Sequence, residues 1–159
     1  MRLYLLRHGI AEEWRPDLPD EQRRLTVEGK RKVRMIAEGL VKIGLDLDLV
    51  ISSPLPRALE TAEIVAETLS ISDKLKTHDG IANGFVLATV QSIVFESPDA
   101  QNIMLVGHEP GFSMLAGALT GGSQIDLKKG GLIRIDLDRI AEGAGVLKWL
   151  LAPAVFAKE

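Results

Sequence analysis

Cysteine is absent from the 159 residues of this sequence. Its absence excludes disulfide bonds, thiolate nucleophiles and thiolate metal ligands together. It also fits a reducing compartment, so we expect a cytoplasmic protein. No apolar run approaches the ~20 residues that a membrane-spanning helix requires, and the N-terminal segment becomes polar at Arg7, too early for a signal peptide. We therefore expect no association with a membrane.

Strongly basic segments are missing as well. The formal net charge is -3 and the isoelectric point is about 5.7, so the balance of acidic and basic residues does not favour a nucleic-acid partner. A local cationic pocket is still compatible with this net charge. The length and the hydrophobic fraction of 46% suit a single domain over residues 1–159 with one sizeable core. Nothing in the sequence requires an oligomer.

A short apolar run near the N-terminus ends abruptly in polar residues. Residues 3–6 show no polar alternation, which is typical of a parallel strand buried on both faces. Arg7, His8 and Gly9 follow directly. Because ligands bind beyond the carboxyl ends of strands in open parallel sheets, Arg7 and His8 are predicted to lie at a functional site.

Two later segments repeat this pattern. The segment 47–51, apolar except for Asp48, leads into a proline-containing helix start whose first turn carries Arg57, at a helix terminus that favours anions. Residues 103–106 end in Gly107 and His108, and a helix follows at once. The predicted strand ends should converge and bring together Arg7, His8, Arg57 and His108.

The remaining periodicity predicts the architecture. Helices are expected from Thr26 to Gly44, from residue 54 onward and over residues 84–96, while residues 74–78 suit a short edge strand. Residues 133–137 alternate and residues 146–151 are mostly apolar, which indicates an antiparallel hairpin. Strand–helix alternation before that hairpin predicts an α/β fold with three α/β/α layers. Residues 12–24 are polar and read as an exposed loop, either a connector or a substrate-contacting lid.

Two arginines and two histidines, with no carboxylate firmly placed beside them, form a cage suited to a phosphate dianion. A metal site would add carboxylates or cysteines, and arginines would repel the cation, so we expect neither metal nor other cofactor. Glycine-rich nucleotide-binding motifs are also absent. A neutral histidine can attack phosphorus and form a phosphohistidine, provided that its other ring N–H is held by a hydrogen bond. The arginines would offset the charge of the transition state.

The sequence resembles the histidine phosphatase superfamily, whose members are phosphoglycerate-mutase-like. The resemblance rests on Leu6-Arg7-His8-Gly9, on the segment 52–62 with Arg57, and on Val106-Gly107-His108-Glu109-Pro110; the short length and residues 25–29 look most like SixA-type phosphohistidine phosphatases. It implies a six-stranded mixed sheet with one antiparallel strand. It also implies that His8 accepts the phosphoryl group. The implied phosphoryl-binding residues are Arg7, Arg57 and His108, with Arg23 as a further substrate contact.

One departure from the family bears on the substrate. Larger relatives that hydrolyse phosphate esters carry a glutamate general acid after the second helix, whereas residues 76–84 contain none; Asp79 is the available substitute, or else a solvent-facing turn residue. An alkoxide leaving group needs a proton, while a protonated imidazole leaves readily. We therefore expect a phosphatase for phosphohistidine on a partner protein. The alternatives are a small-molecule phosphomonoesterase or mutase of the same superfamily, and a non-catalytic phosphate-binding module.

Overall fold

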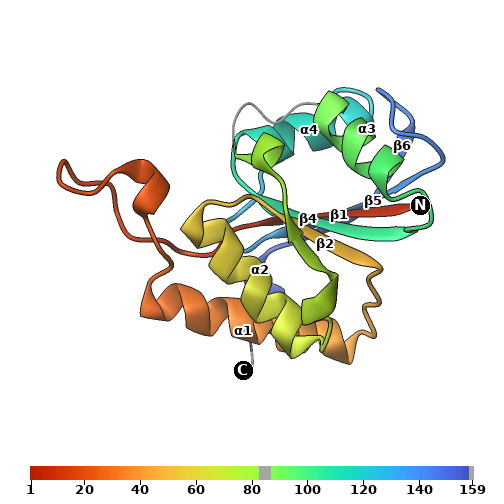
Figure 1. The fold of residues 1–159 in the computed structure, drawn as a ribbon. Helices are drawn as coiled ribbons and strands as arrows, with labels where there is room; N and C mark the ends of the chain where they lie inside the picture. The colour runs from red at the N-terminus through yellow and green to blue at the C-terminus, as the bar shows by residue number, and fades with distance from the viewer. Residues whose placement is uncertain (83–86, 158–159) are drawn as a thin grey trace.

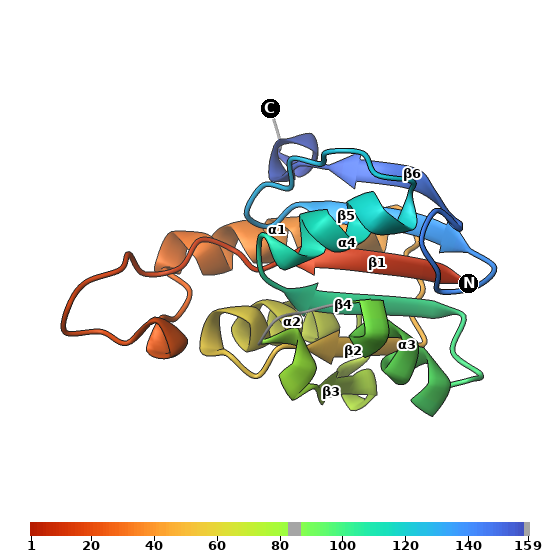
Figure 2. The ribbon, with the colours of Figure 1, turned by 90° about the horizontal axis from the view of Figure 1, so that it is seen from above.

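The computed structural model describes residues 1–82 and 87–157. A six-stranded sheet with the order β3-β2-β4-β1-β5-β6 lies between two layers of helices (Figures 1 and 2). The strands are β1 (Arg2–Arg7), β2 (Leu49–Ser52), β3 (Leu75–Thr77), β4 (Asn102–Gly107), β5 (Leu132–Leu137) and β6 (Gly145–Leu151). The helices are α1 (Val27–Lys42), α2 (Pro56–Thr68), α3 (Leu87–Glu96) and α4 (Gly111–Leu119), and four short 3₁₀ turns include η1 (Asp20–Gln22) and η3 (Asp79–Ile81).

The direction of the strands confirms the predicted mixed sheet. β1, β2, β3 and β4 pair in parallel, β5 pairs antiparallel with β1, and β6 pairs antiparallel with β5. β5 therefore runs opposite to the other five strands. The β5–β6 hairpin and the β3 edge strand are where the sequence predicts them. Of the helix expected over residues 84–96, residues 84–86 lie outside the described part of the chain.

Burial explains why the interiors of the central strands are apolar. Leu3 and Leu5 of β1 face one core cluster, and Tyr4 and Leu6 face the other, all of them 2% exposed or less. In Figure 1, α3 and α4 cover one face of the sheet and α1 and α2 cover the other. A strand enclosed on both faces has no place for polar side chains until it reaches its end.

The long loop after β1 is closed at its base and projects from the body of the protein (Figures 1 and 2). Ala11 and Leu25 form an isolated antiparallel bridge, so the two ends of the 12–24 loop are held together. Thr26 then caps α1 by accepting a hydrogen bond from the Gly29 amide at 2.9 Å, as predicted. The backbone of Ile10 passes so close to this helix start that Gly29 has no space for a side chain.

This close approach gives a prediction about stability. Alanine normally favours a helix over glycine by about 1 kcal/mol, yet the Cβ atom of a Gly29→Ala variant would collide with the carbonyl oxygen of Ile10. We expect the free energy of unfolding to fall by about 1–3 kcal/mol in urea denaturation. Arg34→Ala, on the exposed side of the same helix, is the matched control and should change it by less than about 0.5 kcal/mol. A Gly29→Ala variant as stable as this control would contradict the close approach of the Ile10 carbonyl to Gly29.

Candidate active site

The register of the parallel strands brings three strand ends together. Arg7 is level with Gly107 across the β1–β4 pair, and Ser52 is level with Val106 across the β2–β4 pair. His8 and His108 each follow one of these ends, and their ring centroids are 5.3 Å apart. The structure therefore assembles residues that are one hundred positions apart in the sequence.

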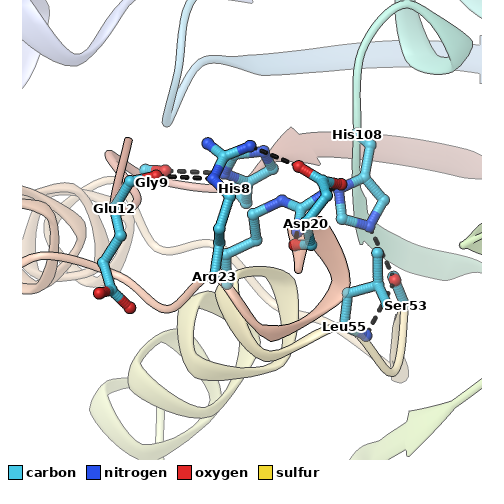
Figure 3. A network of polar contacts seen from close by, with 9 residues as sticks. His8, Gly9, Glu12, Asp20, Arg23, Ser53, Leu55 and His108 are labelled. Carbon is cyan, nitrogen blue, oxygen red and sulfur yellow. Dashed lines mark hydrogen bonds and ion pairs between the residues drawn. The ribbon is translucent and has the colours of Figure 1, made fainter. Parts of the chain in front are cut away.

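The surroundings of His8 define its tautomer. Only 7% of the residue is exposed, and its Nδ1 lies 2.7 Å from the carbonyl oxygen of Gly9 (Figure 3). A carbonyl oxygen only accepts, so Nδ1 carries the proton and Nε2 keeps its lone pair. Burial, against the hydrogen bond to Gly9 and helped by the nearby His108, Arg57 and Arg7, lowers the pKa of His8 to about 3. His8 is thus a neutral imidazole at neutral pH.

The backbone on either side of this imidazole is fixed from several elements. The His8 amide donates to the Gly107 carbonyl at 3.0 Å. The Gly9 amide donates to Thr61 Oγ1 at 3.1 Å, and this hydroxyl donates to the carbonyl of Arg57 in α2. Sheet and helix together therefore set the direction in which Nε2 points.

His108 is held by a second hydrogen-bond chain. Its Nε2 lies 2.8 Å from Ser53 Oγ, which also accepts a hydrogen bond from the Leu55 amide at 3.2 Å (Figure 3). When Ser53 donates its one hydroxyl proton to Nε2, every group in the chain is satisfied and the neutral ring carries its proton on Nδ1. Burial, followed by the charge of Arg57, lowers the pKa of His108 to about 4.

Two buried nitrogen atoms in the site have no hydrogen-bond partner among the described residues. They are Nε of Arg7 and Nδ1 of His108. Arg7 is otherwise anchored, because one terminal nitrogen donates to the carbonyl of Leu127 at 2.8 Å. An unpaired buried polar atom costs about 1–3 kcal/mol, so two such atoms in one site indicate that it is built for a ligand that accepts hydrogen bonds.

The sequence analysis placed no carboxylate beside the basic residues, and this was wrong. Asp20, in η1 of the 12–24 loop, accepts from Arg57 at Oδ2 (3.1 Å) and from Arg23 at Oδ1 (2.6 Å). Its backbone carbonyl also accepts from Arg57 at 2.8 Å. Arg23, the suggested substrate contact, is thereby brought to the site. No local pattern marks Asp20, which is one of several acidic residues in an exposed loop.

Two other carboxylates have different places. Asp79 is exposed at the start of η3, beyond the edge strand β3, and within the described residues it forms no hydrogen bond or ion pair with the two histidines or with Arg57. The structure therefore does not join it to the site. Glu60, which the sequence analysis did not single out, is 9% exposed; it accepts from the Leu25 amide and from Arg24, and so ties the base of the loop to α2.

Within residues 1–82 and 87–157, no three His, Asp or Glu side chains gather in a way that could ligate a metal ion. In the same ranges, no helix combines the length and the apolar character that crossing a bilayer demands.

Comparison with known proteins identifies the family. The family model described as histidine phosphatase superfamily (branch 1) matches residues 3–83, which include β1, the 12–24 loop and α2. An uncharacterized protein of Picosynechococcus sp. strain PCC 7002 is 34% identical over 140 residues, covering 84% of this chain and 83% of the relative. This chain belongs to the histidine phosphatase superfamily, as its motifs led us to expect.

Solved structures of this superfamily share the fold. A protein assigned as phosphohistidine phosphatase SixA from Agrobacterium tumefaciens is 25% identical, with a TM-score of 0.81 over 96% of this chain and 97% of that one. The protein histidine phosphatase SixA complexed with tungstate is 21% identical, with a TM-score of 0.87 over 99% and 100%. A protein assigned as an alpha-ribazole-5'-P phosphatase from Escherichia coli K-12 is 20% identical, with a TM-score of 0.72 over 96% and 97%. SixA-like and small-molecule phosphatases thus share this architecture.

The lowered pKa values of the two histidines predict how stability depends on pH. Between the ordinary value of 6.5 and the folded values of about 3 for His8 and about 4 for His108, the unfolded chain binds more protons. Stability should therefore be complete above 6.5 and fall as the pH drops toward 4. We expect His8→Asn to flatten this slope between pH 6.5 and 5 in thermal unfolding. His78→Asn, which removes an imidazole outside the site, is the control; an equal slope in wild type and His8→Asn would contradict the assignment.

Proposed function

We propose that this chain is a metal-independent phosphatase that removes phosphate from phosphohistidine on a partner protein, acting as a single domain over residues 1–159. In the first step the substrate ring enters protonated on its unphosphorylated nitrogen, Nε2 of His8 attacks phosphorus, the bond from phosphorus to the substrate ring breaks, and the ring leaves as a neutral imidazole that keeps this proton. In the second step water attacks phosphorus, the bond to Nε2 breaks, and inorganic phosphate is released. His8 returns to its neutral state.

The state of His8 supports its role as the nucleophile. A nucleophilic imidazole must be unprotonated at the attacking nitrogen, and the Gly9 carbonyl together with burial keeps Nε2 in that state. The nearby arginines oppose protonation of His8 and attract the phosphoryl dianion at the same time. One set of charges thus favours both a neutral nucleophile and an anionic substrate.

The unpaired atoms support the phosphoryl-binding role of Arg7 and His108. Nε of Arg7 is a donor, and Nδ1 of His108 is a donor in the tautomer that the Ser53 chain favours. Phosphoryl oxygen atoms accept charge-assisted hydrogen bonds from such groups. Arg57 adds further donors from the first turn of α2, at the positive end of the helix dipole, which also favours an anion. Together these groups would stabilise the charge that develops on the equatorial oxygens.

The described residues place no suitable proton donor beside the site, and this carries the choice of substrate. Among the described residues, the carboxylate joined to the site is Asp20; hydrogen bonding to Arg23 and the charge of Arg57 lower its pKa, so it is ionised at neutral pH. Asp79 is exposed and not joined to the site. An alkyl phosphate needs a general acid to protonate its leaving group, whereas a phosphohistidine ring that is protonated on its other nitrogen leaves as a neutral imidazole without one. This arrangement favours the phosphoramidate.

A basic groove beside the site supports a protein as the substrate. It is lined by Arg7, Lys32, Lys128 and Lys129 together with residues of the C-terminal segment. Lys128 is paired with Asp126, but no ion pair is recorded for Lys129 within the described chain. An acidic surface around the phosphohistidine of a partner would be steered to this groove. The lack of cysteine is in keeping with such a partner in the cytoplasm.

The proposal is tested by measuring phosphate release in the presence of a chelator. We expect release from a protein carrying phosphohistidine, slow release from a simple alkyl phosphomonoester, and loss of at least about 10³-fold in His8→Ala because the covalent route is removed. His78→Ala, outside the site, should retain activity. Rapid turnover of the ester would instead favour a small-molecule phosphatase, as in some of the structural neighbours. Tight phosphate binding without release from either substrate would favour a binding module.

A separate prediction concerns the general acid. Because Asp79 is exposed and, among the described residues, forms no hydrogen bond or ion pair with the site, Asp79→Asn should change kcat for the phosphohistidine protein by less than about twofold. For comparison, loss of a working general acid typically costs about 10²–10⁴-fold. The measurement is kcat from pH 5 to 8 in both forms. A drop in kcat of that size would show that Asp79 does protonate the leaving group.

A further inference from the structure

The 12–24 loop places a negative charge where the proposed site binds one. The Asp20 carboxylate lies against two arginines, with one oxygen on Arg57 and the other on Arg23. Figure 3 shows it facing the site between Arg23 and His108. Its charge is felt by His108, whose pKa it raises against the stronger effect of burial. An ionised carboxylate in this position imitates two oxygens of a phosphoryl group.

An anion that enters the site must compete with the hydrogen bonds between Arg57 and Asp20. Arg57 donates two hydrogen bonds to Asp20, one to the side chain and one to the backbone carbonyl. The Arg57 side chain is 8% exposed, while that of Asp20 is 54% exposed. The arginine is therefore fixed within the protein, and the aspartate reaches it from the solvent side. Of the two partners, Asp20 is the one that can move away.

We propose that Asp20 is a specificity-determining residue that competes with the phosphoryl group for Arg57 and Arg23. A bound anion must either displace the carboxylate or accept its repulsion. Singly charged anions gain too little from the site to do so, whereas a phosphoryl dianion gains enough. The inference rests on the proposed phosphoryl site, and it gives the exposed loop the role of rejecting weak anions.

The loop allows such a displacement. Its base is held by the bridge between Ala11 and Leu25 and by Glu60, but η1 itself contains no buried residue. The contact that joins η1 to the site is the one made by Asp20 with Arg57 and Arg23. Moving Asp20 aside would therefore disturb neither the core nor the start of α1.

The opposite role would be to orient the arginines for substrate, and the two roles predict effects of opposite sign. As a competitor, Asp20 weakens the binding of phosphate, so its removal must strengthen binding. As an orienting group, it strengthens the binding of phosphate, so its removal must weaken binding. A variant that merely folds badly would also bind more weakly. Tighter binding is thus a result that damage to the structure cannot produce.

The experiment is calorimetric titration of the full chain with inorganic phosphate at pH 8, which does not depend on turnover. We expect Asp20→Asn and Asp20→Ala to lower the dissociation constant by about three- to tenfold. Asp17→Asn is the matched control, since Asp17 lies in the same loop, is exposed and pairs with Arg15; it should leave the constant unchanged. Unchanged or weaker binding in both Asp20 variants, or equal tightening in Asp17→Asn, would overturn the proposal.

Trp14 provides a second readout of the displacement. It is 68% exposed in the same loop, while Trp149 of β6 packs against Tyr4 and Arg134 and provides a constant background. Saturating phosphate should shift Trp14 emission in the wild type, and Asp20→Asn without phosphate should already show that shift. If the protein binds phosphate as expected but shows no phosphatase activity, the proposed reaction is refuted. The competition between Asp20 and phosphate for the arginines would still be supported. No emission change in either form would contradict the displacement.

Discussion

The hydrogen bond from Nδ1 of His8 to the carbonyl of Gly9 is the interaction on which the site depends. It fixes the proton on one ring nitrogen and leaves the other free to attack. A protonated His8 could not act as a nucleophile, and burial among arginines makes protonation unfavourable. The fold supplies both conditions by ending a doubly buried strand at Arg7 and His8. The same burial lowers stability in acid, so a property that favours nucleophilic attack is linked to a cost in folding.

In the proposed reaction the positive charges of the site would act together on substrate and nucleophile. The arginines disfavour protonation of His8 and would attract a phosphoryl group, and two buried nitrogens without a partner among the described residues could donate to it. Asp20 opposes this field from the exposed loop. If the proposed roles hold, binding of phosphate is a balance between the arginines within the protein and a carboxylate at the edge of the site, and the loop can set this balance without changing the core.

The fold was predictable because its signals are local. The apolar interiors of β1 and β4, the cap at Thr26 and the alternation of β5 each follow from a few neighbouring residues. The convergence of the strand ends followed from the general geometry of parallel sheets. Asp20 was missed because one acidic residue in a polar loop resembles the others. Glu60 was missed because its partners, Leu25 and Arg24, come from a distant segment.

The sequence alone determined the class of the sheet, the four basic residues at its strand ends and the superfamily to which the chain belongs. Burial patterns and motifs are properties of short segments, so they can be recognised in the sequence without a structure. Tertiary structure decided which nitrogen of each histidine is free, which polar atoms lack a partner, and that Asp20 rather than Asp79 lies against the arginines. Those facts depend on distances between segments far apart in the chain, and only the packed sheet and its loops set such distances.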